Sequence, residues 1–336
     1  MLVGMIVGLL DSLVALLVLG LPVIDAGAPA PLAPAPAPGP TAAQLWNAQR
    51  SPSLGPPQAI GTYAGGCLQG ASALPASGPG YEALHRSRNR YFGHPTLVAF
   101  IRRLGAVAKK RHLGVLIVGD LSQARGGPTP SGHRSHQSGL DVDLGYAPPV
   151  GLRTGHLKSA DRERLGPPAV VDLRTHEMTA VWGSRPARLV AAAASDPAVD
   201  RVFVNPAVRR ALCAGPARKA AWFAHVRPWW GHHDHFHVRL KCPDESPLCA
   251  AQDPPPVDVD DGCGATLAWW FSPDAQSTES RRKQTQDDQQ GKGQGPVLPE
   301  ACAALLAPPG AAALLPAPAP ALAPAAAPTP AAAPAP

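Results

Sequence analysis

Proline-rich segments at both ends limit where this chain can fold. Residues 27–57 and 307–336 consist largely of alanine and proline, and the whole chain contains 42 prolines in 336 residues. Proline breaks the helices that alanine favours, and neither segment has the apolar periodicity of a core-forming stretch. We therefore expect an Ala/Pro-rich linker at 27–57 and a disordered tail at 307–336, with one folded domain at 58–306.

The first 26 residues are almost entirely apolar and predict export. Within residues 1–24 only Asp11 and Ser12 interrupt the apolar run, and the small residues Ala26 and Ala28 suit cleavage of a signal peptide. The run is also just long enough to span a bilayer, so an uncleaved membrane anchor is the alternative. Either interpretation of residues 1–26 places the domain outside the cytoplasm, and we expect a periplasmic location.

Six cysteines in an exported chain favour disulfides over thiolate ligation of zinc. No two of them have C-x-x-C spacing, and an even number can pair completely. The spacing favours only the local pair Cys242–Cys249 and leaves the other pairings open. The six residues are Cys67, Cys213, Cys242, Cys249, Cys263 and Cys302.

The charge of the chain gives a weak indication of its partners. A net charge of +6 is too small to indicate nucleic acid, and no nucleic-acid recognition motif accompanies it. A mildly basic protein is compatible with an anionic polymer such as the bacterial cell wall. Nothing in the sequence indicates the oligomeric state.

Helical and strand-like segments follow one another irregularly in the central part of the chain. Apolar residues recur at helical spacing in 94–114, and a second helical stretch is expected at 187–194. The segments 115–121 and 201–205 are rich in valine and other large apolar residues and predict strands. This mixture predicts an α+β fold with a small, mostly antiparallel sheet that carries the functional site, flanked by helices and long loops and held by disulfides.

Two further segments alternate polar and apolar residues as strands do. In "LDVDL" the polar positions are Asp141 and Asp143, and in "HFHVRL" they are His235, His237 and Arg239. A period of two puts all polar side chains of such a strand on one face. We therefore predict two strands that each present ligand-capable side chains from one side of an apolar layer.

These polar faces can supply a catalytic zinc site. Zinc in enzymes takes about three protein ligands from imidazole and carboxylate groups and leaves a fourth position for water. His136, Asp143 and His237 can provide that set, which suits Zn²⁺ better than magnesium or calcium. Zinc lowers the pKa of a bound water towards ~7, and His235 is the natural candidate for the base that manages the protons.

The sequence resembles the penicillin-insensitive murein endopeptidases, zinc metallopeptidases related to those that cut D-Ala-D-Ala bonds. The resemblance rests on the pattern H-x6-D from His136 to Asp143, followed by H-x-H from His235 to His237. The matching stretches, spread over most of 61–271, are "YFGHPTLVAFIRRL", "SHQSGLDVDL", "VFVNPAVRR" and "VRPWWGHHDHFHVRLKCP".

The resemblance implies a specific site and substrate. His136, Asp143 and His237 would bind zinc, and His232 and His235 would assist catalysis. The substrate would be the D-alanyl–meso-diaminopimelyl cross-link between peptidoglycan stem peptides. The implied disulfides are Cys67–Cys302, Cys213–Cys263 and Cys242–Cys249.

Two other roles near this site stay open at the level of sequence. Family members can carry a second metal, for which His133 is a candidate ligand and Asp172 and His176 are the nearest downstream candidates, although the spacing does not match cleanly. His133 could equally contact substrate or stabilise its loop. We interpret Asp141 as an acceptor that holds a ligand histidine in place.

The sequence therefore predicts an exported zinc endopeptidase of peptidoglycan. The nearest alternative is a D,D-carboxypeptidase that removes a terminal D-alanine with the same metal site. A second alternative is a wall-binding or metal-binding protein without activity, against which the intact ligand and base positions argue.

Overall fold

The computed structural model describes residues 39–130, 133–152, 155, 157–253, 261–277 and 298–306. From Pro40 onward these residues belong to one compact unit. The predicted signal peptide or anchor, the first part of the predicted linker and the predicted tail lie outside the described residues. No helix in the described part of the chain is long and apolar enough to cross a membrane.

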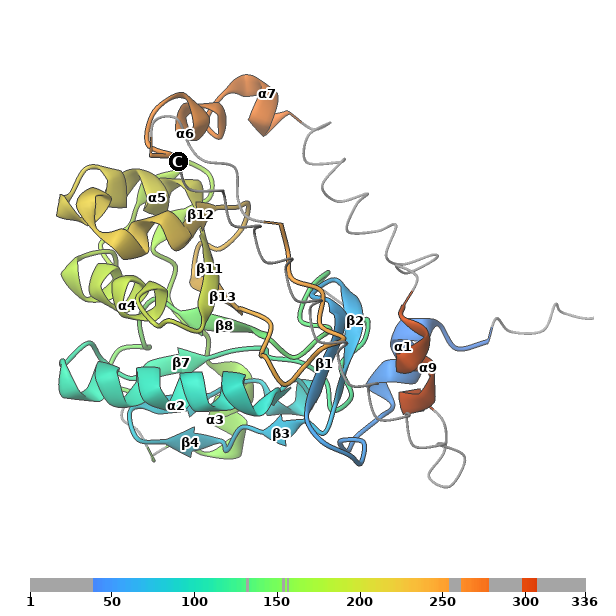
Figure 1. The fold of residues 1–336 in the computed structure, drawn as a ribbon. Coiled ribbons are helices and arrows are strands. Elements are labelled where there is room, and N and C mark those ends of the chain that lie inside the picture. Colours follow the sequence, from blue (N-terminus) through green and yellow to red (C-terminus); the bar gives the residue numbers. More distant parts are fainter. Residues whose placement is uncertain are drawn as a thin grey trace, which may run out of the picture. The chain divides into compact units, whose positions relative to one another are not determined.

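A seven-stranded sheet forms the centre of the fold (Figure 1). In spatial order its strands are β12 (Val226–Pro228), β11 (Val199–Val204), β13 (His235–Leu240), β8 (Asp141–Gly145), β7 (Leu116–Val118), β5 (Tyr81–Ala83) and β4 (Ser77–Gly78). Neighbouring strands are antiparallel except for β11 with β12 and β5 with β7. The sheet is therefore mostly antiparallel, as predicted.

Helices and small hairpins surround this sheet and complete the α+β fold that the sequence predicts. The helices are α1 (Ala42–Asn47), α2 (Pro95–Lys110), α3 (Ser159–Arg164), α4 (Ser184–Ala194), α5 (Pro206–Cys213), α6 (Ala265–Trp269), α7 (Pro273–Gln276) and α9 (Glu300–Leu306), with short 3-10 helices η1 (Arg86–Arg88), η2 (Pro216–Lys219) and η3 (Ala221–His225). The small hairpins pair β1 (Gln58–Thr62) with β2 (Gly65–Gln69), β3 (Ser72–Ala73) with β6 (Phe92–Gly93), and β9 (Val171–Asp172) with β10 (Glu177–Met178).

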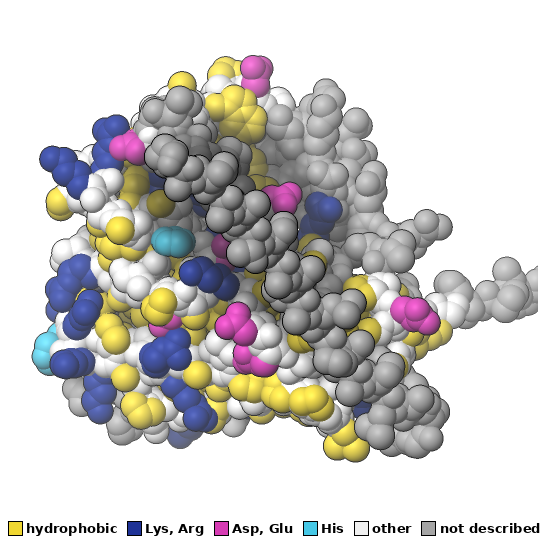
Figure 2. Space-filling model, in the orientation of Figure 1, with side chains coloured by type: hydrophobic (Ala, Val, Ile, Leu, Met, Phe, Trp, Pro, Cys, Tyr) yellow, Lys and Arg dark blue, Asp and Glu magenta, His cyan; other side chains and the backbone are white. Residues whose placement is uncertain are grey.

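Helix α2 covers part of the sheet, as its apolar spacing predicts. Its buried side, which includes Phe100 and Ile101, packs against β5, β7 and α4. The exposed side is basic, and Figure 2 shows lysine and arginine side chains gathered over this part of the surface. The helix ends at Lys110, earlier than the predicted Gly114, because His112 adopts a left-handed backbone conformation with φ of 53°.

A second, smaller core lies beside the β1–β2 hairpin. Trp46 of α1 is buried there, together with the Cys67–Cys302 disulfide. Helix α1 begins with a capping box, in which Thr41 and Gln44 each accept a backbone N–H hydrogen bond from the other. Part of the segment predicted as a linker, 27–57, is therefore folded.

All six cysteines form disulfides, in the pairing that the resemblance implies. Cys67–Cys302 joins β2 to α9, and Cys213–Cys263 joins the end of α5 to the turn before α6. Cys242–Cys249 closes a short loop after β13, which is the pair that the spacing favoured. No thiol is left for a metal or for nucleophilic chemistry among these cysteines.

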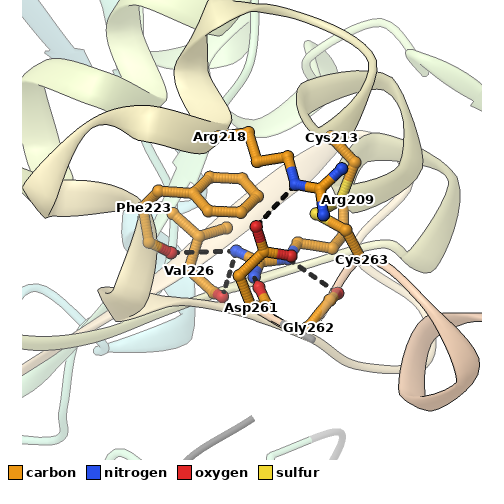
Figure 3. Close-up of a disulfide and its surroundings, with 8 residues drawn as sticks. All are labelled: Arg209, Cys213, Arg218, Phe223, Val226, Asp261, Gly262 and Cys263. Carbon is orange, nitrogen blue, oxygen red and sulfur yellow. Dashed lines mark hydrogen bonds and ion pairs between the residues drawn. A yellow bond between two sulfur atoms is a disulfide. The ribbon is translucent and has the colours of Figure 1, made fainter. Parts of the chain in front are cut away.

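A buried arginine next to the Cys213–Cys263 disulfide connects three segments (Figure 3). Arg209 is 1% exposed, and its guanidinium donates to the carbonyl oxygens of Phe223 at 2.8 Å, Val226 at 2.9 Å and Asp261 at 2.7 Å. These bonds fix α5 to the start of β12 and to the turn before α6. We call Arg209 and these three carbonyl groups the Arg209 cluster.

Candidate metal centre

Two adjacent strands bring the two predicted polar faces together. β8 and β13 are antiparallel neighbours, and their register places Asp143 opposite His237 and Asp141 opposite Arg239. On the other side of β13, Phe203 of β11 lies opposite His237, and the two rings meet edge to face with centroids 5.5 Å apart. Residues almost 100 positions apart therefore share one face, as the alternating pattern predicts.

The loop before β8 adds two imidazoles. His136 is 1% exposed and has a φ of 69°, which is uncommon for a residue other than glycine. The Asp141 carboxylate holds this conformation by accepting the backbone N–H of His136 at 3.0 Å. The ligand atoms of His133, His136 and Asp143 all lie within 4.8 Å of one another, and they form the candidate metal-binding group of the described residues.

His237 approaches the same carboxylate from the neighbouring strand. Its Nδ1 lies 3.1 Å from Oδ1 of Asp143, and its Nε2 lies 3.2 Å from Oδ1 of Asp141. The rings of His136 and His237 are 4.7 Å apart between centroids. The three predicted ligands thus come together, with His133 beside them.

The buried atoms of this centre are short of hydrogen bonds. Both ring nitrogens of His136 and Oδ1 of Asp143 are buried without a hydrogen-bond partner. Oδ1 of Asp143 instead has imidazole nitrogens at 3.1 Å from His237, 3.5 Å from His136 and 3.9 Å from His235. Buried polar atoms are rarely left unpaired, so this arrangement fits a bound cation between a carboxylate and imidazoles.

The electrostatics of the centre favour positive charge. Burial alone would raise the pKa of Asp143, but the charges of His136, His235 and His133 hold it well below its usual range. Burial lowers the pKa of His237, and the Asp141 and Asp143 carboxylates outweigh it and raise that pKa to about 9. Surroundings that stabilise a protonated His237 this strongly would also stabilise a metal ion bound to the ring in place of the proton.

His235 and His232 stand at the edge of this centre. His235 has its Nδ1 2.6 Å from Oδ1 of Asp234, and its Nε2 faces Asp143. His232 directs Nδ1 to the Trp230 carbonyl oxygen at 2.7 Å, and its ring centroid is 5.2 Å from that of His235. Burial lowers the pKa of His232 to about 3, so this ring is neutral and offers Nε2 as an acceptor.

Comparison with known proteins assigns this arrangement to a family. The family of penicillin-insensitive murein endopeptidases matches residues 59–307, which include every residue of the centre. The chain belongs to this family. It is therefore a peptidase.

Relatives in the family are similar over most of their length. The penicillin-insensitive murein endopeptidase of Yersinia enterocolitica is 40% identical over 269 residues, which cover 79% of this chain and 91% of the relative. Those of Klebsiella pneumoniae and Pectobacterium atrosepticum are 39% identical and cover 80% and 78% of this chain, and 93% and 88% of their own lengths.

In this murein endopeptidase family member, Asp141 lies behind the predicted ligands. Its carboxylate accepts two hydrogen bonds from Arg239, at 2.9 Å and 3.1 Å, in addition to the His136 backbone N–H. It is fully buried and also contacts His237. Asp141 thus contacts two of the predicted ligands, and its role in holding them for a metal stays a prediction.

Asp120 is a partner that the sequence did not reveal. It follows β7, is 3% exposed, and contacts Nε2 of His133 at 3.0 Å. Burial raises the pKa of Asp120, but the hydrogen bond and charge of His133, with Arg90 and Arg88, lower it to about 2. The signal in the sequence was an aspartate at the end of an apolar strand, where the carboxylate would otherwise be buried without a partner.

Of the three residues that the sequence suggested for a second metal site, only one lies at the centre. His133 is there, but Asp172 is 43% exposed in its side chain and accepts hydrogen bonds from the backbone of the β9–β10 turn, which also contains His176. In the described part of the chain these residues do not form a metal-binding group with His133. A second metal held by His133, Asp172 and His176 stays a prediction.

Proposed function

We propose that this chain is a zinc-dependent murein endopeptidase that hydrolyses D-alanyl–meso-diaminopimelyl cross-links in peptidoglycan. The observation that carries the proposal is the buried Oδ1 of Asp143, which three imidazoles approach without hydrogen-bonding to it. The relatives named above are murein endopeptidases, and this supports peptidoglycan as the substrate.

The chain's own residues would hold the ion. His136, Asp143 and His237 would bind one Zn²⁺, and Asp141 would keep His237 and the backbone of His136 in position. When bound, zinc would polarise the scissile carbonyl and lower the pKa of a water molecule towards ~7. Arg239 supports the arrangement because it neutralises the charge of Asp141.

Two histidines outside this set would handle protons. Nε2 of His235 faces Asp143, so it lies beside the place where the peptide bond would react, and would take a proton from the attacking water and return it to the leaving amine. His232 would assist through Nε2, which can accept a hydrogen bond from water or substrate because Nδ1 is engaged with the Trp230 carbonyl.

We also propose that the enzyme acts in the periplasm. The apolar segment 1–26 would direct export, either as a cleaved signal peptide or as an anchor. Three disulfides suit an oxidising compartment, and the substrate is found there. The catalytic domain would comprise residues 58–306.

The test is digestion of purified cross-linked muropeptide dimers by the zinc-loaded protein, with mass spectrometry of the products. His237→Ala removes a proposed ligand, and His112→Ala, at an exposed position beyond α2, is the matched control. Zinc content is measured for all three proteins by elemental analysis. We expect monomers and about one zinc ion per chain from wild type and His112→Ala, and neither from His237→Ala.

Other outcomes would reject specific parts of the proposal. Release of a terminal D-alanine without cleavage of dimers would indicate a carboxypeptidase. Binding of dimers and zinc without any product would indicate a wall-binding protein. Activity without bound zinc, or full activity of His237→Ala, would reject the proposed centre.

A further inference from the structure

We propose that Asp234 is a positioning residue for catalysis, which fixes the ring orientation and tautomer of His235. This inference rests on the proposed function, because His235 is the proposed base. Oδ1 of Asp234 lies 2.6 Å from Nδ1 of His235, which is a short hydrogen bond between these two groups. A carboxylate can only accept, so Nδ1 carries the hydrogen, and the lone pair of the neutral ring is on Nε2.

The orientation of the His235 ring determines how this hydrogen bond affects catalysis. Nε2 faces the centre, at 3.9 Å from Oδ1 of Asp143. A general base needs its lone pair on the nitrogen nearest the reacting water. With the hydrogen on Nε2 instead, His235 would present a donor to the centre and could not take a proton there.

The backbone around Asp234 is held in place, which fixes the point from which its side chain reaches His235. The backbone N–H of Tyr146, at the end of β8, donates to the Asp234 carbonyl at 3.3 Å, and the Tyr146 hydroxyl donates to the His232 carbonyl at 3.3 Å. The N–H groups of Val170 and Val171 donate to the carbonyl oxygen of His233, at 2.7 Å and 3.3 Å. The residues before β13 are thus docked on two other segments.

Contacts between a carboxylate and an imidazole recur around the centre. Asp234 differs from the other carboxylates in the histidine that it contacts. Asp120 contacts His133, and Asp141 contacts His237. Asp234 has the corresponding contact with the ring that would move protons. It would also stabilise the imidazolium that forms when His235 accepts a proton, as the aspartate of a Ser-His-Asp triad does.

The experiment compares Asp234→Asn, Asp234→Ala and Asp234→Glu in the full-length, zinc-loaded protein. Kinetics on cross-linked dimers separate kcat from KM, and zinc content and the unfolding midpoint are recorded for each variant. Asp161→Asn, at an exposed ion pair in α3, is the matched control. ¹⁵N NMR of the histidine side chains reports which nitrogen of His235 carries the hydrogen.

We expect kcat to fall about 10- to 100-fold in Asp234→Asn and Asp234→Ala, while KM and zinc content stay within about twofold of wild type. Asp234→Glu should recover part of the loss because it restores an acceptor. The ¹⁵N shifts should show hydrogen on Nδ1 in wild type and a mixture of tautomers in Asp234→Ala.

Two results would overturn the inference. One is a wild-type kcat in both Asp234→Asn and Asp234→Ala. The other is a loss of activity that follows loss of zinc or of folding, which would make the role structural. If wild type does not cleave dimers, the proposed function fails, and the ¹⁵N shifts of His235 still decide whether Asp234 sets its tautomer.

Discussion

Two buried polar clusters in this fold are built in opposite ways. In the Arg209 cluster, a single cation on α5 donates to backbone carbonyls of two other segments, 223–226 and the turn before α6, at normal hydrogen-bond distances. In the centre around Asp143, several titratable side chains approach one another, yet His136 has no hydrogen-bond partner for either ring nitrogen. The first cluster is completed by the protein itself, whereas the second has buried atoms without hydrogen-bond partners and fits a bound cation.

This difference indicates what each cluster is for. A satisfied buried cation fastens segments together, and removing it leaves carbonyl groups unpaired. An unsatisfied cluster of a carboxylate and imidazoles is held in place by its surroundings, here Asp141 and Arg239, so that donor atoms converge before a ligand arrives. The Arg209 cluster should therefore govern stability, and the Asp143 centre should govern zinc binding and activity.

The largest effect is expected for Asp143→Asn. The amide lacks the charge that draws imidazoles and a cation together, so zinc content should fall and kcat/KM on cross-linked dimers should drop by at least ~1000-fold. The variant should also lose the stabilisation by zinc that wild type gains, which is about 2.7 kcal/mol at a zinc concentration 100 times Kd. Elemental analysis, kinetics and urea unfolding with and without zinc measure these quantities. Stoichiometric zinc and wild-type activity in Asp143→Asn would contradict the assignment.

Arg209→Met should show the reverse pattern. It leaves the carbonyls of Phe223, Val226 and Asp261 unpaired, so we expect the free energy of unfolding to fall by about 3–5 kcal/mol. The increase in stability on adding zinc should remain. Arg218→Met is the matched control, because Arg218 pairs with the Asp261 side chain (Figure 3) and both side chains are about half exposed. It should change stability by less than ~1 kcal/mol. Equal losses of unfolding free energy in Arg209→Met and Arg218→Met would show that the Arg209 cluster does not govern stability.

Removing the Cys213–Cys263 disulfide should also weaken the Arg209 cluster, since Asp261 and Cys263 belong to the same turn. Its two cysteines are 50 residues apart, against 7 for Cys242–Cys249. A longer closed loop restricts the unfolded chain more, so a double serine variant at 213 and 263 should lose about 2–4 kcal/mol, and the corresponding variant at 242 and 249 should lose less. Denaturant unfolding of both variants is the measurement, and the opposite order would show that loop closure is not the main contribution.

The smallest effect is a dependence of stability on pH in the metal-free enzyme. The folded pKa of His237 is raised to about 9, so its contribution is present in full below the unfolded pKa of ~6.5 and is lost as pH rises through about 9. We expect the metal-free protein to lose on the order of 2 kcal/mol between pH 6.5 and 9.5 from this group. Zinc replaces the proton, so the loaded protein should not show this loss. Urea unfolding of both forms, with His237→Gln as the control, tests this, and identical pH profiles for loaded and metal-free protein would contradict it.

Part of the centre could be predicted from sequence because it depends on side chains in regular strands. Asp141, Asp143, His235 and His237 alternate with apolar residues, and the register of β8 and β13 follows from burial of that apolar set. His136 was proposed from its residue type and the family resemblance supports it, but it sits in a loop with a left-handed backbone and has no periodic signal.

Other parts of the fold and of the centre depend on contacts that no residue pattern predicts. Arg209 donates to backbone carbonyls, which every residue has, so no residue type in the sequence predicts its acceptors. Asp120 is separated from His133 by a loop, and only the folded chain brings them within 3.0 Å. Helix α1 was missed because its cap at Thr41 is embedded in an alanine- and proline-rich segment.

The Cys67–Cys302 disulfide makes most of this chain a covalent ring, since its two cysteines are 235 residues apart in sequence. A protease that cuts one peptide bond inside the ring opens it but releases no fragment, and the residues of the candidate metal centre stay on one molecule. Such a nick would be invisible by mass on a non-reducing gel and would appear only after reduction.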